Sequence, residues 1–311
     1  MRLESNVSGK TRGPVSGEKV MPAAARKSAI DRVIQEIEHL PTLPQVVMRV
    51  LAMAESPRVS AIELSKAMDQ SLAAKVLKLA NSAYYGVRST RNINSIHHAI
   101  VLIGFETVKE IILTTSFFHT FHDSRDVQAL QPLWEHSLEC ALISKRLAWM
   151  YRYDSLDEAY LSGLTHDIGK LVIQQYFPDQ YEEFERNKEK GMEMLAAEKE
   201  ALSITHAEIG GKMAERWSFP ANLVDAITHH HDRGWKVNPT LGKILFYADQ
   251  FTFGLIDFAG LTQKFSQEGM SYPAAWDSSD LASVEIILQE EMGKAKSLFS
   301  LALDKSNQVH T

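Results

Sequence analysis

The residues of this 311-residue chain best suited to chemistry stand together at His166-Asp167, with Lys170 shortly after them. An imidazole and a carboxylate are ligands that a divalent metal ion accepts, and a lysine ammonium can hold an anion such as a phosphate. A His-Asp dipeptide also occurs by chance. Its meaning therefore depends on whether other histidines and carboxylates fall where they can complete a site.

Further candidates stand on both sides of this dipeptide, on segments with a helical pattern. His136 lies near the start of a predicted helix. His206 falls inside Thr205-His206-Ala207-Glu208, a capping-box pattern that places it in a first helical turn. The run His229-His230-His231 ends the next predicted helix, and Asp249 lies on the helix after that. These residues are the candidates to share a metal ion with the dipeptide.

The pattern around the dipeptide predicts that helices carry it into the interior. Ser155-Leu156-Asp157-Glu158 is a second capping-box pattern, so a helix should run from there into Gly163. The apolar run Leu171-Val172-Ile173 follows the dipeptide. We therefore expect His166 and Asp167 to lie inside a bundle of helices.

The rest of the chain predicts an all-α protein, a multi-helix bundle. Apolar residues recur at helical spacing in short segments joined by tight turns, and no segment has the pattern of a strand or of an internal repeat. Side chains suited to helix N-caps precede several of these segments, and the helix after the last cap should close at Gly104. The predicted caps are Ser60 (with Glu63), Asp69 and Ser95.

Several stretches carry weaker signals. Residues 117–127 are interpreted as a connector in which His119, His122 and Asp123 lie at a boundary or on the surface. Residues 181–190 predict a solvated charged helix, residues 258–279 are low in pattern, and residues 281–303 predict a final helix. Three polar residues that could touch a ligand are interpreted instead as helix-end and turn residues: Asn81, Ser82 and Tyr85.

Composition narrows the class of protein. With 45% hydrophobic and 23% charged residues, it is that of an ordinary globular protein. The presence of a single cysteine, Cys140, excludes an intramolecular disulfide and favours a cytoplasmic location. We interpret Cys140 as a small core residue rather than as a zinc ligand with His136. The net charge of −6 does not favour non-specific nucleic-acid binding, there is no DNA-binding motif, and no uncharged apolar run is long enough to span a membrane.

The first 28 residues combine Gly, Ser, Pro, Lys and Arg with few large apolar side chains. They lack the apolar region of a secretory signal and predict a disordered leader. A solvated tail is the simpler interpretation of its basic charge; binding of an acidic partner is the alternative.

Several spaced motifs in the first half resemble the HDOD family, all-helical bacterial signalling modules named for their likeness to HD phosphohydrolases. The motifs are Leu40-Pro-Thr-Leu-Pro44, Asp69, Leu79-Ala-Asn-Ser-Ala83, Ser95, Ala99-Ile100 and Leu102-Ile103-Gly104. The resemblance covers residues 30–235, divided into an N-terminal helical part (30–125) and an HD-like part (126–235), and leaves residues 236–311 as a C-terminal helical extension. It implies a regulatory or scaffolding role with protein partners.

The candidate ligands occur in the order found in HD-superfamily phosphohydrolases, which implies a metal site. Aligning the HDOD pattern through Val224-Asp225-Ala226-Ile227 selects His230 and His231 rather than His229. The implied ligands are His136, His166, Asp167, His206, His230, His231 and Asp249. Such a set suits one or two divalent ions (Fe, Mn, Zn or Ni), with Asp167 as the bridge, and Asp167 and Lys170 would act on a phosphoryl group.

One departure limits the choice of substrate. The His pair is followed by Arg233-Gly234-Trp235 and lacks the Gly-Tyr-Pro of the cyclic-dinucleotide phosphodiesterases. This departure argues against cyclic di-GMP hydrolysis and leaves the metal site untouched. Two hypotheses follow: a signalling protein, able to form a homodimer, whose metal is structural or regulatory, or a metal-dependent phosphohydrolase acting on a nucleotide-like phosphoester.

Overall fold

The computed structural model describes residues 45–54, 66, 68–81, 93–120, 130–273 and 277–303. These residues form helices and their connections, and none of them lies in a β-strand, which confirms the all-α prediction. The helices are α2 (Gln45–Ala54), α4 (Gln70–Ala80), α5 (Ile96–Ile103), α6 (Phe105–Thr120), α7 (Gln131–Met150), α8 (Leu156–Thr165), α9 (Ile168–Tyr176), α10 (Pro178–Glu189), α11 (Met194–Leu202), α12 (His206–Arg216), α13 (Ala221–Thr228), α14 (Pro239–Thr252), α15 (Phe258–Gln267) and α16 (Ser278–Leu303).

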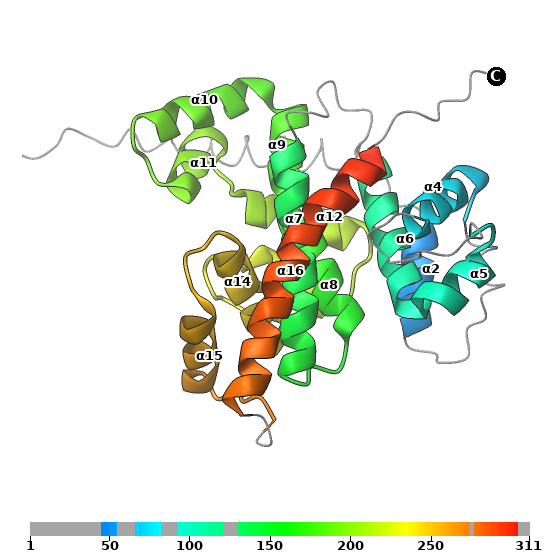
Figure 1. The fold of residues 1–311 in the computed structure, drawn as a ribbon. Helices are drawn as coiled ribbons and strands as arrows, with labels where there is room; N and C mark the ends of the chain where they lie inside the picture. The colour runs from blue at the N-terminus through cyan, green and yellow to red at the C-terminus, as the bar shows by residue number, and fades with distance from the viewer. Residues whose placement is uncertain are drawn as a thin grey trace, which may run out of the picture.

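The long helix α7 lies at the centre of the arrangement. It packs against α8, α14 and α16, while α2, α4, α5 and α6 gather on one side of the molecule (Figure 1). The helices α10 and α11 form a hairpin that projects on the other side (Figure 1). One continuous apolar core runs from Val46 to Leu288, so the two parts of the predicted HDOD region and the C-terminal extension share buried surface.

Polar contacts also join these parts. The buried Lys109 on α6 pairs with Asp157 in the first turn of α8, with 2.5 Å between Nζ and Oδ2. Arg146 on α7 donates from Nη2 to Glu291 Oε1 of α16 at 2.7 Å. The last helix therefore packs along the centre of the fold and also contacts α4.

Most predicted helix starts are confirmed by their caps. The side chains of Asp69 and Ser95 accept from backbone N–H groups in the first turn, and α5 ends at Gly104, whose φ is +87°. Thr205 and Glu208 form the complete capping box. Ser155 caps α8 as predicted, but the Glu158 carboxylate instead accepts from side chains on other segments, so that box is only half formed.

Two weak-signal stretches differ from their predictions. The connector proposed for residues 117–127 begins too early, because α6 continues to Thr120 and buries Phe117 and Phe118 against the ring of Trp134. Tertiary packing outweighs the low helix propensity of the preceding Thr and Ser residues. The low-pattern segment 258–279 contains α15, which Asp257 caps.

A third expectation concerned polar residues near the end of α4. Asn81 has a structural role, since its amide donates to the Leu77 and Ile93 carbonyls and its oxygen accepts from Ile93 N–H. The side chains of Ser82, Tyr85, His119, His122 and Asp123, the Ser60 capping box and the leader lie outside the described residues.

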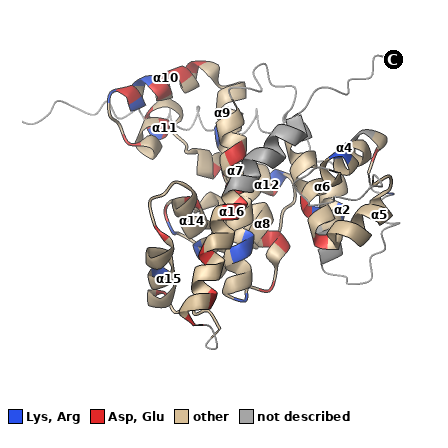
Figure 2. Ribbon diagram, viewed as in Figure 1, with Lys and Arg blue, Asp and Glu red and all other residues tan. Residues whose placement is uncertain are grey.

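The surface agrees with the predicted character of α10. This helix carries both acidic and basic side chains (Figure 2), and of its residues Phe184 and Asn187 are the buried ones. In the part of the chain that the structure describes, no helix is both long and apolar enough to cross a bilayer.

Candidate metal centre

The structure brings all seven predicted ligands together in one place. Each comes from a different helix or helix end except for the adjacent pairs. They are His136 on α7, His166 and Asp167 at the junction of α8 and α9, His206 at the start of α12, His230 and His231 just after α13, and Asp249 on α14. All but His136 and His231 are buried.

Four of these residues form a first group. His136 Nε2 lies 3.2 Å from His166 Nε2 and 3.0 Å from Asp249 Oδ1. Asp167 Oδ2 lies 3.6 Å from His136 Nε2 and 3.5 Å from His166 Nε2. Two imidazole nitrogens and two carboxylate oxygens therefore surround one small volume.

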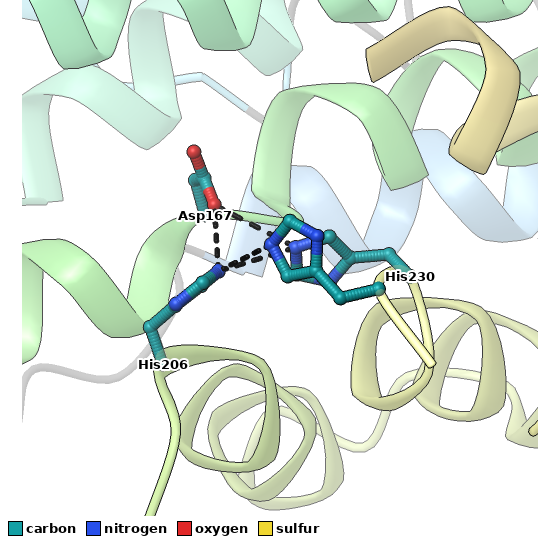
Figure 3. Close-up of side chains that lie close together, drawn as sticks. Asp167, His206 and His230 are labelled. Atoms are coloured by element: carbon teal, nitrogen blue, oxygen red, sulfur yellow. Dashed lines mark hydrogen bonds and ion pairs between the residues drawn. The ribbon is translucent and has the colours of Figure 1, made fainter. Parts of the chain in front are cut away.

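A second group shares Asp167 with the first. Its other oxygen, Oδ1, lies 3.2 Å from His206 Nε2 and 3.7 Å from His230 Nε2. His206 Nε2 is in turn 3.3 Å from His230 Nε2 and 3.0 Å from His231 Nε2. Figure 3 shows Asp167, His206 and His230 pointing toward one another. The carboxylate of Asp167 thus faces one group with each oxygen.

Asp167 occupies the N-cap position of α9, but its carboxylate accepts no hydrogen bond from the first turn of that helix. Both carboxylate oxygens can therefore face the two groups. Its Oδ2 accepts from Lys170 Nζ at 2.6 Å. Its Oδ1 and Asp249 Oδ1 are buried and have no hydrogen-bond donor of suitable geometry among the described residues. Buried carboxylate oxygens without donors are costly, so both atoms are suited to a cation.

Hydrogen bonds fix which nitrogen of each imidazole carries the proton. His166 Nδ1 lies 2.8 Å from the Gly163 carbonyl and His230 Nδ1 lies 2.6 Å from the Ile227 carbonyl. A carbonyl oxygen only accepts, so each Nδ1 must donate, and a neutral ring then has its lone pair on Nε2. His206 Nδ1 donates likewise to Glu198, a carboxylate 1% exposed.

The fourth histidine follows the same rule. The Thr252 hydroxyl donates to the Asp249 carbonyl at 2.8 Å and so presents a lone pair to His136 Nδ1, 3.4 Å away. Four Nε2 lone pairs consequently point at one another and at carboxylate oxygens. Lone pairs that meet in this way require a proton or a metal ion between them.

The spacing matches ligands around a metal ion. Nitrogen and oxygen atoms bound to one ion at about 2.1 Å are themselves about 3.0–3.4 Å apart, and the nitrogen–nitrogen and nitrogen–oxygen distances given above fall between 3.0 and 3.7 Å. The side chains of these groups could therefore hold a metal ion.

The histidines of the cluster differ in the direction of their pKa shifts, and carboxylates raise the pKa of both His166 in the first group and His206 in the second. Burial would lower the pKa of His166, but the Asp167 and Asp249 carboxylates outweigh it, and the pKa is raised. Burial and the neighbouring imidazoles lower the pKa of His230 and bring that of His231 to about 2. The surrounding imidazoles and Lys170 hold the pKa of the Asp167 carboxyl far below its ordinary value despite burial. Neutral imidazoles beside ionised carboxylates are the states that bind metal.

Close approach of helices positions the ligands. A Cβ added to Gly169 would lie 1.9 Å from the His206 carbonyl oxygen, and one added to Gly163 would lie 2.6 Å from the backbone of Ala141. Glycine at these two positions lets α9 touch the start of α12 and lets α8 touch α7. The glycines that flank the His-Asp dipeptide thereby bring His206 and His136 within reach of it.

Of two neighbouring candidates, one pairs outside the groups and the other lies beside the first group. His229 points away and pairs with Asp232 near the surface, with 2.9 Å between Nδ1 and Oδ1. Cys140 is buried close to His166 and Asp249, and the ligand atoms of these three residues lie within 4.8 Å of one another, so its sulfur could join them around an ion.

Sequence reasoning missed the residues that orient the ligands. Glu198 and Thr252 hold His206 and His136, and the carbonyls of Gly163 and Ile227 hold the other two buried rings. The carbonyls leave no mark in the sequence. A weak signal existed for Glu198, because the residues three and four positions away from it on α11 are all apolar (Met194, Leu195, Ala201 and Leu202).

Comparison with known proteins identifies the family. The HDOD domain profile matches residues 40–233, which is more than half of the chain. The chain belongs to the HDOD family. Asp249 lies beyond the matched region, so this HDOD protein takes the seventh residue of the cluster from its C-terminal part.

Curated relatives of this HDOD protein are distant and longer. An uncharacterized protein of Treponema pallidum is 22% identical over 204 residues, covering 64% of this chain and 39% of that protein. A ribonuclease Y of Deinococcus radiodurans is 28% identical over 102 residues, covering 33% of this chain and 13% of that protein. The chain thus spans well under two thirds of the length of these relatives.

Solved structures share the fold over most of the chain. An HDOD domain protein of unknown function from Geobacter sulfurreducens has a TM-score of 0.73 and 23% identity, covering 90% of this chain and 99% of that one. A proposed phosphohydrolase from Shewanella amazonensis has a TM-score of 0.69 and 23% identity, and the match covers 87% of this chain and 97% of that one. A proposed signal transduction protein from Marinobacter aquaeolei has a TM-score of 0.63 and 21% identity, and the match covers 90% of this chain and 65% of that one. At these identities the likeness establishes the fold alone.

Proposed function

We propose that this HDOD protein binds two divalent metal ions and hydrolyses a phosphoester of a nucleotide-like substrate. The observation that carries the proposal is the set of Nε2 lone pairs on His136, His166, His206 and His230, each fixed by a hydrogen bond at Nδ1 and aimed at the two oxygens of Asp167. A purely structural cluster would pair these atoms with donors.

Each group would hold one ion, and Asp167 would bridge them. His136, His166 and Asp249 would hold the first ion, and the remaining three histidines would hold the second. Mixed imidazole and carboxylate ligands suit iron, manganese, zinc or nickel. When bound, such ions supply a nucleophile at neutral pH and neutralise charge on a phosphoryl group.

The protein's own groups prepare the site for that chemistry. Lys170 donates to Asp167 Oδ2 and its pKa is raised by that carboxylate against the effect of burial, so its ammonium stays charged. An ammonium has three N–H donors, and those not directed at Asp167 can hold a phosphate oxygen. The side chain is about a quarter exposed, which leaves it open to a substrate.

The names of related proteins support a phosphoester as the substrate. Two curated relatives are called ribonuclease Y, from Deinococcus radiodurans and Mycoplasmoides gallisepticum, and one solved structure with this fold is described as a phosphohydrolase. Ribonucleases act on phosphodiesters, so a phosphodiester is the first substrate to test. The whole relatives are much longer than this chain, and their activities are not transferred to it.

Metal analysis and turnover together test the proposal. We expect about two equivalents of metal per chain after anaerobic purification, and manganese- or iron-dependent hydrolysis of a generic phosphodiester and of members of a nucleotide panel. Asp167→Ala should lose both. The matched control Asp232→Ala removes an exposed aspartate and should lose neither. Less than a tenth of an equivalent of metal in the wild type, or turnover that survives Asp167→Ala, would overturn the proposal.

A second candidate function is a signalling module in which the metal regulates binding to a protein partner. One structure with this fold is described as a signal transduction protein, and His166, His206 and His230 are fully buried, which limits access to the centre. This alternative predicts bound metal without turnover on any phosphoester. The same pair of measurements therefore separates the two functions.

A further inference from the structure

An exposed aromatic ring lies directly on the proposed metal centre. Phe253 stands four residues after Asp249, so both lie on one face at the end of α14. Its ring centroid is 4.3 Å from that of His136, with 30° between the planes. One face of the ring covers the proposed ligand, yet 55% of the residue is exposed.

The end of α14 fixes this ring in place. Phe253 N–H donates to the Asp249 carbonyl at 3.2 Å, and Leu255 N–H donates to the Gln250 carbonyl at 2.9 Å. Gly254 adopts a φ of +67°, which completes a Schellman end that glycine allows. Since the cap is closed by backbone bonds, Phe253 is held next to its ligand neighbour rather than left on a loose loop.

Shielding of His136 does not explain this arrangement alone. A ring that served only as a cover would be expected to bury its outer face against neighbouring side chains. Here the next apolar residue, Leu255, is 75% exposed instead of packing on the helix end. The two residues present an apolar surface beside a centre whose ligands are polar.

We propose that Phe253 is a stacking platform for the base of a nucleoside phosphate whose phosphate lies at the metal centre. The inference rests on the proposed function and names its substrate class. The His136 ring that Phe253 covers carries the proposed ligand atom Nε2, so the platform lies beside the metal centre. Stacking on an aromatic face accepts any base, because every base has a π-face. The platform therefore selects nucleotides over simple phosphoesters without selecting a sequence.

Two esters with the same leaving group test the platform. Thymidine 5′-(4-nitrophenyl) phosphate carries a base, and methyl 4-nitrophenyl phosphate does not. For the metal-loaded protein, Phe253→Leu should raise KM for the thymidine ester about tenfold and leave kcat and the methyl ester unchanged. Leucine keeps an apolar cover on His136 and removes the aromatic face. Phe253→Trp should retain the wild-type KM, and Ile286→Ala, at an exposed apolar residue of α16, is the surface control.

A binding measurement keeps the inference testable if neither ester is hydrolysed, which would count against the proposed function. By calorimetry, adenosine monophosphate should bind the metal-loaded wild type about tenfold more tightly than ribose 5-phosphate. Phe253→Leu should abolish that difference, with metal content unchanged. Equal binding of the two ligands by the wild type, or a difference that survives Phe253→Leu, would overturn the platform.

Discussion

The carboxylate of Glu198 accepts two kinds of hydrogen bond from His206. The backbone N–H of His206 donates to Oε2 at 2.9 Å, and Nδ1–H donates at 2.8 Å. Both side chains are buried, so the pair is not shared with solvent. Glu198 therefore holds the ring in one orientation and increases the electron density on the Nε2 lone pair that faces Asp167.

Replacing this carboxylate should weaken metal binding without removing a ligand. Glu198→Gln keeps an oxygen that accepts but loses the charge, and the loss of such a partner typically lowers metal affinity by about 10–100-fold. Competition with a chelator of known affinity measures the effect, which should fall on one of the two equivalents of metal. Glu200→Gln, an exposed acid on the same helix, is the control. Equal affinities in both variants would contradict the orienting role.

Acidification should release the metal. Carboxylates raise the pKa of His166 and His206 above the ordinary value, even though burial acts in the opposite direction. A raised pKa means that protons compete for these rings as the pH falls, whereas His231, with a pKa of about 2, stays neutral. Metal content after equilibrium dialysis should be constant near pH 8 and fall below about pH 6. Full occupancy at pH 5 would contradict this expectation.

The fold and the composition of the cluster were predictable because they depend on local signals. Helical periodicity and capping side chains such as Asp69, Ser95 and Thr205 mark helices regardless of tertiary context. The order of histidines and aspartates then matched a known arrangement. The sequence could not show that these side chains meet in space, since their approach depends on the close contact between Gly169 and the His206 backbone.

The predictions with weaker sequence signals failed where tertiary packing determines whether a segment is helical. The end of α6 contains Thr and Ser residues that disfavour helix, yet Phe117 and Phe118 pack on Trp134 and extend it. The stripe of α15 is Phe258, Leu261 and Phe265, diluted by polar residues. The orienting bonds to His166 and His230 use backbone carbonyls, which any residue would supply.

Gly169 should be intolerant of a side chain. The Cβ of Gly169→Ala would lie 1.9 Å from a backbone oxygen, so helices α9 and α12 must separate. Overpacking of this kind costs about 1–3 kcal/mol of unfolding free energy. In Gly210→Ala the nearest atom is Ile227 Cγ2 at 3.1 Å, a side chain that can shift. Chemical denaturation should show the larger loss for Gly169→Ala, and both variants share the gain in helix propensity.

A buried ion pair joins α6 to α8. Lys109 and Asp157 have side chains 3% and 12% exposed, so removing one partner leaves a poorly solvated charge. Lys109→Met should lower the unfolding free energy by about 3 kcal/mol, and adding Asp157→Asn should recover most of that loss. The exposed pair Arg186–Glu182, 3.8 Å apart, is the control, and Arg186→Met should cost at most about 1 kcal/mol. A double variant no more stable than Lys109→Met would mean that Lys109 stabilises the contact through packing of its stem rather than through its charge.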